Sequence, residues 1–433
     1  NQSRFRRSDN TTDAFVDLGP SNYRSPGYRY QLVESFPPYQ QYQTLEDRIL
    51  FGFVAGDSSS VVAWNTNFLK APMVSRDHGA TYYPFAHGGS FKEACQLALG
   101  PSPDDIALAR NEYGTVATSN GGLVWKGHNM YNSPEWPQTF ESCLGRKGVQ
   151  WWWCRSSWGV AFAPNNNSII LTVFGWGPST VWRSEDAGET WGLVAQVNLT
   201  SITDGRVLWA SADTVYISSW RSDDGGRTFP HNLGRPVGAV SSSSPNVVVS
   251  KRNSQDIALS TNKGVSWTQL PTPPPASDGQ GSVLFTWGNL GVDIDPFPSP
   301  VNDVRILAAG EAGVWEYTSA SGQWRSLHMA MVPDPFLGPR PWLGYVVFDP
   351  NPARNGTVYA MAAGGGRGQW VQGRGQLPAH QVYVSQDGGG SWSNIADDLP
   401  KFFAANGPPV VDKVTGDLLF SDFGGLYRWG SKL

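Results

Sequence analysis

Three kinds of side chain that can act on sugars recur just before, or in the turns between, the short β-rich runs of this sequence. Carboxylates can donate and accept protons, aromatic rings can stack on sugar faces, and guanidinium groups can hold hydroxyl or carboxylate groups. The candidate catalytic carboxylates are Asp47, Glu93, Asp204, Glu311 and Asp422. The candidate substrate-binding residues are Tyr113, Arg155, Trp158, Trp176, Arg206, Trp287, Arg340 and Trp342. These residue types favour a carbohydrate ligand, and a close pair of the carboxylates would allow hydrolysis of a glycosidic bond.

An eight-residue frame recurs along the chain and indicates the elements that would position these side chains. The frame is Ser or Thr, any residue, Asp or Asn, any residue, Gly, any residue, Thr or Ser, and an aromatic residue, as in SEDAGETW. Copies begin at Ser75, Thr118, Ser184, Ser222, Ser260 and Ser385, with a worn copy at Thr318. The third residue can accept backbone hydrogen bonds, and Gly at the fifth position can adopt a positive φ. Each copy, here called a frame turn, therefore predicts a tight turn between two strands.

Each frame turn follows three short β-rich runs and precedes one more. Such a unit predicts a four-stranded antiparallel sheet, and radial repetition of this sheet is the architecture of a β-propeller. The spacing favours eight blades, the last of them a half unit at Gly424–Trp429, with a strand such as Tyr30–Ser35 closing the ring. Seven blades remain possible if the unit at Ser184 or Ser222 is not a full sheet. We expect one all-β domain over residues 1–433, with an irregular arm over 1–29 and blades from about 30 to 433.

The antiparallel order decides the rim on which each connection lies. Connections from strand one to two and from three to four leave by one rim, and the others leave by the opposite rim. The frame turns join strands three and four, so they define a turn rim. The long insertions instead follow a fourth strand or join strands two and three; they are 126–157, 268–283, 325–341 and 363–379. Since harmless insertions would occur on both rims, we expect the functional site on the opposite rim, the loop rim.

The frame resembles the Asp-box, or BNR, repeat of sialidases, xyloglucan-active propeller glycosidases and sortilin-type receptors, over about residues 45–430. The box is structural in those families, so the resemblance implies the fold more than the function. The segment SDFGGLYRW, Ser421–Trp429, also resembles a segment of the xyloglucan-active enzymes that places a catalytic Asp at the cleft. Asp422 occupies that position. Those enzymes carry the second carboxylate on a second propeller, so here we expect the partner from the same ring.

Three functions remain open on these residues. The first is glycoside hydrolysis by a carboxylate pair. The second is a uronate-directed polysaccharide lyase, in which an Arg holds the substrate carboxylate and a Tyr or His acts as base. The candidates for these two roles are Arg155, Arg206, Arg235 and Arg340, and Tyr113, His128 and His380. The third is a non-catalytic glycan-binding or peptide-binding propeller, a lectin or a sortilin-like protein, with the same aromatic and basic rim but no carboxylate pair.

Composition and charge narrow the remaining choices. The chain has 433 residues and a net charge of −4, with no basic stripe, which argues against nucleic acid as a partner. The sequence contains no apolar stretch of about 18 residues, so it predicts no transmembrane helix. The first ten residues lack an initiator Met and an apolar segment, which we interpret as the start of a mature, secreted and extracellular form. We expect a monomer.

Sequons and cysteines support the same interpretation. Asn-X-Ser/Thr triplets predict a glycoprotein; they begin at Asn1, Asn10, Asn166, Asn198 and Asn355. Of the three cysteines, Cys143 and Cys154 are the expected disulfide, and Cys95 is expected to be buried and free. There is no CxxC motif and the six His are scattered, so we expect no metal site and no cofactor.

Overall fold

The protein is an all-β structure in the part of the chain that the computed structural model describes. The described residues are 4–7, 16–20, 49–54, 57–65, 73–75, 83–84, 94–110, 114–121, 126–127, 157–175, 178–199, 205–275, 284, 291–297, 303–311, 313–327, 343–362, 382–395, 407–421 and 426–430. Among them, no helix is long and apolar enough to cross a membrane. The one helical element of these ranges is the short 3₁₀-helix η5, Pro352–Arg354.

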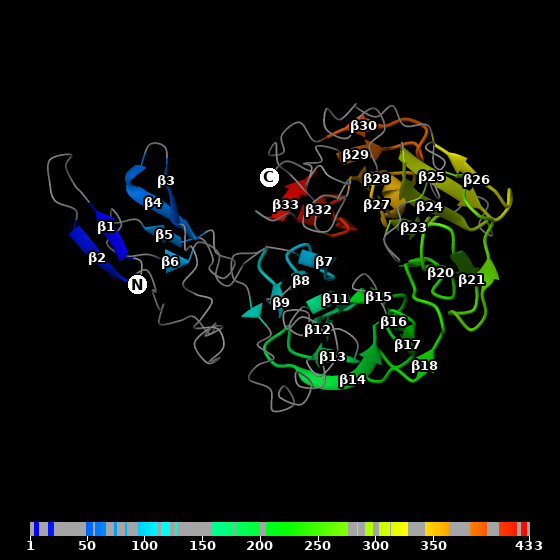
Figure 1. Ribbon diagram of the computed structural model, residues 1–433, viewed down its shortest axis with the longest axis horizontal. Helices are drawn as coiled ribbons and strands as arrows, with labels where there is room; N and C mark the ends of the chain where they lie inside the picture. Colours follow the sequence, from blue (N-terminus) through cyan, green and yellow to red (C-terminus); the bar gives the residue numbers. More distant parts are fainter. Residues whose placement is uncertain are drawn as a thin grey trace.

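Seven antiparallel sheets form a ring, and within each sheet the strands pair in chain order (Figure 1). The first sheet contains β7 Ala94–Leu99, β8 Ile106–Arg110, β9 Gly114–Thr118 and β10 Lys126–Gly127. The second contains β11 Ser157–Ala163, β12 Asn166–Phe174, β13 Pro178–Ser184 and β14 Gly192–Asn198. The third contains β15 Val207–Trp209, β16 Val215–Ile217, β17 Trp220–Ser222 and β18 His231–Asn232. The fourth sheet contains β19 Ala239–Val240, β20 Val248–Lys251, β21 Ile257–Ser260 and β22 Thr268–Gln269, and the fifth contains β23 Val292–Ile294, β24 Arg305–Gly310, β25 Gly313–Thr318 and β26 Trp324–Ser326. The sixth contains β27 Tyr345–Phe348, β28 Val358–Met361, β29 Val382–Ser385 and β30 Ser393–Asn394. The seventh contains β31 Val410–Val411, β32 Leu418–Ser421 and β33 Leu426–Trp429. The predicted propeller is therefore confirmed.

The ring closes with seven blades, whereas the spacing of the frame turns favoured eight. The first strands contact one another in the circuit β7, β11, β15, β19, β23, β27, β31 and back to β7. The units at Ser184 and Ser222 are full four-stranded sheets, so the reason we gave for seven blades is wrong. The ring instead omits the sheet formed by β3 Ile49–Val54, β4 Asp57–Asn65, β5 Met73–Ser75 and β6 Tyr83–Pro84, which Figure 1 shows beside the ring.

The structure agrees with the sequence prediction at the C-terminal end of the chain and differs from it within the N-terminal arm. The last blade, β31–β33, has three described strands, as expected from the half unit at the C-terminus. The segment Tyr30–Ser35, expected to complete it, lies outside the described residues. Within the expected irregular arm, β1 Arg4–Arg7 pairs with β2 Val16–Pro20 in a two-stranded sheet.

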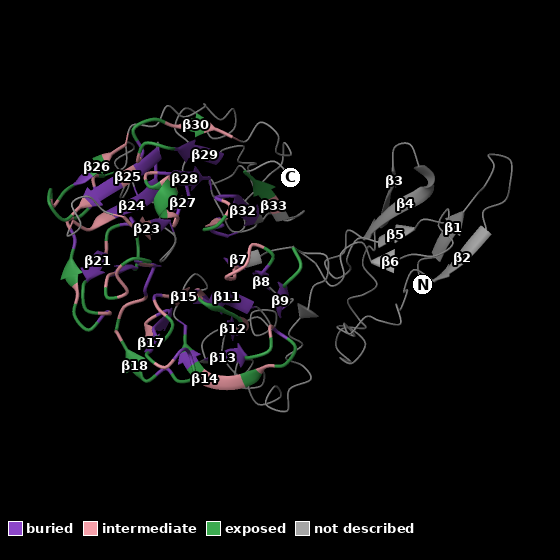
Figure 2. Cartoon of the chain, turned by 180° about the vertical axis from the view of Figure 1, so that it is seen from behind, coloured by how far each residue is buried: buried purple, intermediate pink, exposed green. Residues whose placement is uncertain are grey.

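The blades are held together by side chains packed between adjacent sheets. Several inner strands, such as β11, β16, β20 and β28, are buried on both faces because neighbouring sheets cover them. Fourth strands such as β18 and β22 are exposed. Figure 2 shows this order from buried inner strands to exposed outer strands. Apolar and β-branched residues of the inner strands thus form cores that each span more than one blade.

The frame turns join strands three and four, as predicted, and their hydrogen bonds recur from blade to blade. In the turn at Ser184, the Ser184 hydroxyl donates to Asp186 Oδ1 and accepts from the Gly188 N–H, both at 2.8 Å. Asp186 also accepts from the N–H and the hydroxyl of Thr190, at 2.8 and 2.6 Å. Gly188 has the predicted positive φ, 90°, and the Trp191 indole donates to its carbonyl at 3.1 Å. The same pattern in the turns at Ser222 and Ser385 makes the turn rim a set of rigid corners.

Candidate functional site

The strand order places the long insertions on the rim opposite the frame turns. The insertions that begin at residues 126, 268 and 325 start within β10, β22 and β26, the fourth strands, and each leads to the first strand of the next blade. The insertion 363–379 joins β28 to β29, the second and third strands. All four therefore leave from the loop rim, because both kinds of connection lie on that side of an antiparallel meander.

Most of the predicted site residues fall outside the described part of the chain. These are Asp47, Glu93, Asp204 and Asp422 among the carboxylates, and Tyr113, Arg155, Trp176, Trp287, Arg340 and Trp342 among the binding residues. The expected disulfide cysteines Cys143 and Cys154 and the sequon residue Asn10 also lie outside it. Trp158, Arg206 and Glu311 remain for comparison with the structure.

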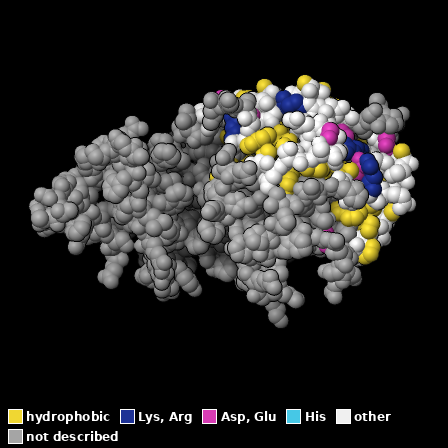
Figure 3. Space-filling model, turned by 90° about the horizontal axis from the view of Figure 1, so that it is seen from above, with side chains coloured by type: hydrophobic (Ala, Val, Ile, Leu, Met, Phe, Trp, Pro, Cys, Tyr) yellow, Lys and Arg dark blue, Asp and Glu magenta, His cyan; other side chains and the backbone are white. Residues whose placement is uncertain are grey.

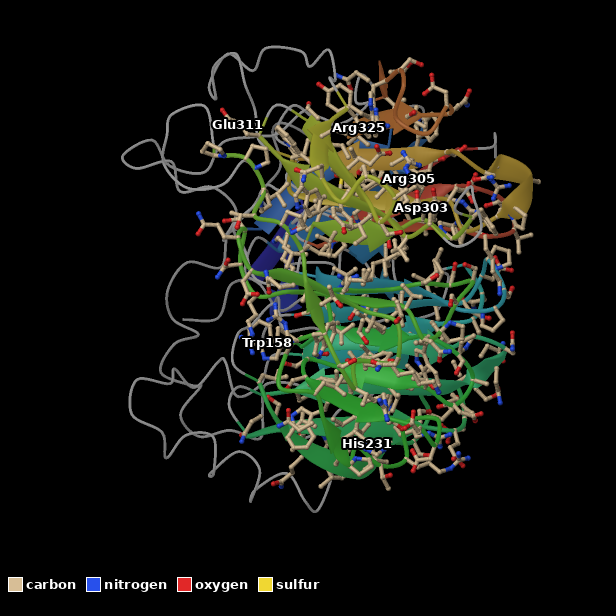
Figure 4. All side chains as sticks on the ribbon, turned by 90° about the vertical axis from the view of Figure 1, so that its right-hand side faces the viewer. Trp158, His231, Asp303, Arg305, Glu311 and Arg325 are labelled. Atoms are coloured by element: carbon tan, nitrogen blue, oxygen red, sulfur yellow. The ribbon has the colours of Figure 1, made fainter. Side chains whose placement is uncertain are left out.

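Trp158 and Glu311 both lie toward the loop rim but belong to blades on opposite sides of the ring. Figure 4 shows them toward one rim, with Asp303 and Arg305 toward the other. Trp158 is only 2% exposed and packs so closely on Gly205 that a Cβ there would overlap its side chain. Its ring therefore serves the core between two blades rather than an open platform. Glu311, 8% exposed, follows β24, and its backbone carbonyl accepts a hydrogen bond from the Trp315 indole at 3.2 Å.

A cavity of about 320 Å³ runs along the axis of the ring and contains the third residue, Arg206. First-strand segments of several blades line it, mostly with Val, Pro, Leu and Gly. Arg206 and Gly238 precede their strands at the loop rim, whereas Leu99 and Pro350 come from the opposite ends of theirs. The lining thus extends along the inner strands from one end to the other.

Asp293, which the sequence analysis did not select, is the carboxylate that lines this cavity among the described residues. It lies in β23, and its Oδ1 accepts from the Ile294 N–H while its Oδ2 accepts from the Phe348 N–H of the next blade, both at 2.9 Å. A signal was present in the run GVDIDPF, where acidic residues alternate with apolar ones inside an expected inner strand. Only the ring geometry shows that the first of them borders the axis.

Arg206 and Asp293 border the same cavity without an ion pair between them. Arg206 Nη1 donates to the Gly238 carbonyl at 3.1 Å, and its buried Nε has no hydrogen-bond partner. Burial lowers the pKa of Arg206, and the charges of Asp293 and Tyr345 oppose this shift. Burial raises the pKa of Asp293 to about 6, although its two backbone hydrogen bonds and Arg206 act in the opposite direction. Among the described residues that line the cavity, there is therefore one cation and one carboxyl group whose pKa is raised to about 6.

The outer surface of the described blades is mixed in charge. In the view of Figure 3, Lys and Arg side chains lie beside Asp and Glu side chains, with apolar patches between them. Within the described residues, no group of three or more His, Cys, Asp and Glu side chains is arranged to hold a metal ion.

Comparison with known proteins identifies the architecture. No family model and no curated protein matches the chain. A GH74 xyloglucanase from Xanthomonas campestris is similar in structure, with 16% identity and a TM-score of 0.53 over 79% of this chain and 52% of the enzyme. The chain thus spans about half the length of that enzyme. YCF48 bound to a D1 peptide aligns with 13% identity and a TM-score of 0.49 over 80% of this chain and 94% of its own. At these identities the likeness concerns the fold, and the chain is similar to other propellers in its ring of antiparallel blades.

Proposed function

We propose that the protein is a carbohydrate-active propeller that hydrolyses glycosidic bonds at the loop rim with a pair of carboxylates. The observation that carries the proposal is the segregation of the connections: short frame turns on one rim and every long insertion on the other. A scaffold with one working face needs this arrangement, because binding residues on variable loops must be held by a rigid ring.

Two further observations support the class of substrate. The architecture is similar to that of a GH74 xyloglucanase, an enzyme named for its action on a polysaccharide. The segment Ser421–Trp429 resembles the segment that carries a catalytic Asp in xyloglucan-active propellers. In the last blade β32 ends at Ser421 and β33 begins at the paired Leu426, and a connection between a second and a third strand lies at the loop rim. Asp422 is the proposed catalytic carboxylate, with Glu311, Glu93, Asp204 or Asp47 as its partner.

The test is release of reducing ends from a panel of plant and fungal polysaccharides. Wild-type protein should cleave at least one of them, and Asp422→Asn should lower its kcat by a factor of about 100 or more, the usual contribution of an acid or base. Glu311→Gln tests the partner. Asp303→Asn is the matched control, since Asp303 is a half-buried carboxylate that accepts from the Ser319 hydroxyl on the turn rim, and it should keep full activity. Activity that survives both Asp422→Asn and Glu311→Gln would contradict the choice of carboxylates, and tight polysaccharide binding without cleavage would favour a lectin.

We also propose that the protein is secreted and N-glycosylated, with a disulfide between Cys143 and Cys154. Three of the sequons support this because their Asn residues are exposed: Asn166 at the start of β12, Asn198 at the end of β14, and Asn355, which follows η5.

A further inference from the structure

The axial cavity is lined by an unusual hydrogen-bond donor, the guanidinium group of Arg206. A guanidinium group has five N–H donors in a planar fork and no acceptor. In Arg206 the hydrogen bond from Nη1 to the Gly238 carbonyl uses one of them, and the buried Nε has no partner. Buried polar atoms are nearly always hydrogen-bonded in native proteins, so an unpartnered Nε in a residue that lines a cavity is unusual.

The carboxyl group of Asp293 does not provide the missing partner. Its two oxygens accept backbone N–H groups from β23 and β27, an arrangement that holds the group against the wall of the ring. It lies near enough to Arg206 for an electrostatic interaction, but the two side chains form no ion pair. The guanidinium of Arg206, which lines the cavity, therefore keeps N–H groups beyond its bond to Gly238 that no acceptor among the described residues takes, while the Asp293 carboxylate is occupied by backbone donors.

The rest of the lining selects for a small ligand with one polar end. The cavity of about 320 Å³ is within the range of about 300 to 1,000 Å³ in which proteins hold small molecules. Apart from Arg206 and Asp293, it is bordered mainly by aliphatic side chains and by Gly and Pro. Arg prefers carboxylates among organic anions because its fork matches their two oxygens.

We propose that the axial cavity binds the carboxylate group of a small ligand, with the guanidinium group of Arg206 as its donor. Two sources share this chemistry: a free small carboxylic acid, and a uronic acid residue of an acidic glycan. The inference does not rest on the proposed hydrolysis, because binding at the axis needs no cleavage at the loop rim.

The pH of the solution changes the charge beside this site. Protonation of Asp293 below about pH 6 removes the negative charge that would repel a bound carboxylate. Asp295 also acts on Asp293, and Tyr345 acts on Arg206, so these are the other titratable groups that face the pair. A carboxylate ligand should therefore bind more tightly at about pH 5 than at about pH 7.5.

Titration calorimetry with sodium glucuronate, sodium acetate and glucose tests the proposal. Glucuronate should bind at about pH 5, and glucose, which lacks the carboxylate, should bind at least about tenfold more weakly, since a hydrogen bond to a charged group contributes about 1.5 to 3 kcal/mol. Acetate as tight as glucuronate would indicate a site for free carboxylic acids, and glucuronate about tenfold tighter than acetate would indicate a sugar acid. Glucose as tight as glucuronate, or no binding of either carboxylate at concentrations up to about 50 mM, would overturn the proposal.

Substitution of Arg206 tests whether glucuronate binds in the axial cavity. Arg206→Gln should weaken glucuronate at least about tenfold, whereas Arg227→Gln, which removes an Arg with a 60% exposed side chain on the turn rim, should leave it unchanged. Equal affinity in folded Arg206→Gln would reject Arg206 as the donor. If that variant does not fold, thermal unfolding of the wild type decides: glucuronate should raise Tm above the value in glucose with sodium chloride at equal ionic strength, and equal values would reject the site. Loss of hydrolysis in Asp422→Asn with unchanged glucuronate binding would separate this site from the hydrolytic one.

Discussion

The guanidinium of Arg221 donates a hydrogen bond of 2.8 Å from Nη1 to the backbone carbonyl of Lys263 in the next blade. Lys263 is the fourth residue of its frame turn. Arg183 makes the same kind of bond to Gly225, and Arg305 to Gly388, each acceptor again the fourth residue of the next frame turn. The fourth position has a positive φ, which presents its carbonyl to the preceding blade. The frame turns therefore connect neighbouring blades in addition to ending them.

This relationship explains the near-duplicate segments at Trp182–Trp191 and Trp220–Phe229. In each, an Arg precedes the frame and pairs with the acidic residue at its second position, Glu185 or Asp223. The acidic residue orients the Arg within its own turn, and the Arg then reaches the next blade. The shared sequence thus encodes both the corner of a blade and its bond to a neighbour.

Removing one inter-blade bond should lower stability measurably. Arg221→Met leaves the Lys263 carbonyl without its donor and the buried turn without its cation, so the free energy of unfolding should fall by about 1 to 3 kcal/mol. Arg227→Met is the control, because Arg227 is exposed, donates to the Asp224 carbonyl in its own turn, and reaches the preceding blade only through a solvent-exposed ion pair with Glu185 at 3.9 Å. Urea unfolding followed by tryptophan fluorescence measures both. Equal loss in the two variants would mean that the inter-blade bond does not stabilise the ring.

The fifth position of the frame requires glycine for two reasons that a pair of variants can separate. Gly226 has a φ of 80°, and a Cβ there would overlap the Leu171 side chain of the preceding blade. Gly234 has a similar φ, 69°, but a Cβ would have no atom within 4 Å. Gly234→Ala should therefore cost about 1 to 2 kcal/mol from the backbone conformation alone, and Gly226→Ala should cost more. A Gly226→Ala variant no less stable than Gly234→Ala in urea unfolding would contradict the steric argument.

Local patterns in the sequence predicted those parts of the fold that depend on nearby residues. The frame predicted the turn, its hydrogen-bonding Asp and its Gly, and the period of strands predicted which rim each connection uses. The non-glycine residues Ala187 and Lys263, with φ of 57° and 60°, were not anticipated because their side chains do not signal that conformation. The number of blades in the ring depends on packing angles between sheets, which no single repeat determines.

The same limit applies to the candidate site. Arg206 was selected because it precedes an inner strand, and the structure places it at the axis. Trp158 was selected for the same reason, yet its ring lies in the core, because alternate positions of an inner strand face the neighbouring blade. Asp293 was missed because an acidic residue within an apolar run borders the axis only once seven first strands enclose it.

Acid should weaken the frame turns that contain Asp. The hydroxyl and N–H of Ser391 and the hydroxyl of Ser385 lower the pKa of Asp387 to about 2 from its ordinary 3.8. A depressed pKa contributes stability above the unfolded value, and this contribution is lost as the pH falls from about 4 to about 2. Asp387→Asn should therefore lower Tm at neutral pH and lower it less at about pH 3.

A natural Asn at the same position provides the matched control. Asn262 occupies the third position of the frame at Ser260 and accepts from the Ser266 N–H at 2.9 Å, as Asp387 accepts from the Ser391 N–H at 2.8 Å. Asn262→Asp should raise Tm at neutral pH more than at about pH 3, the reverse of Asp387→Asn. Parallel shifts of Tm at both pH values for either variant would exclude the proposed linkage.

Glycosylation should follow the accessibility of the sequons. After secretion from a eukaryotic host, intact mass before and after enzymatic deglycosylation should show glycans at Asn166, Asn198 and Asn355, which are exposed. Ser168→Ala removes the first sequon without changing Asn166 and should reduce the mass by one glycan. An unmodified Asn166 in secreted protein would contradict the proposal that this surface is glycosylated.

Asp293 should make the folded ring less stable as the solution becomes less acidic. Its pKa in the folded protein, about 6, lies above its ordinary value of 3.8, so the folded state binds the proton more tightly than the unfolded state. Stability from this group is therefore present below about pH 4 and is lost as the pH rises to about 6, a total of about 2 to 3 kcal/mol. Asp293→Asn retains one acceptor oxygen but never ionises, so its stability relative to the wild type should improve between about pH 4 and about pH 7. Urea unfolding of both proteins at the two pH values measures this difference, and a difference that does not change with pH would show that Asp293 titrates normally. Because the charge of Asp293 acts on Arg206 across the axial cavity, the pH at which the stability difference stops changing should coincide with the pH above which glucuronate binding begins to weaken.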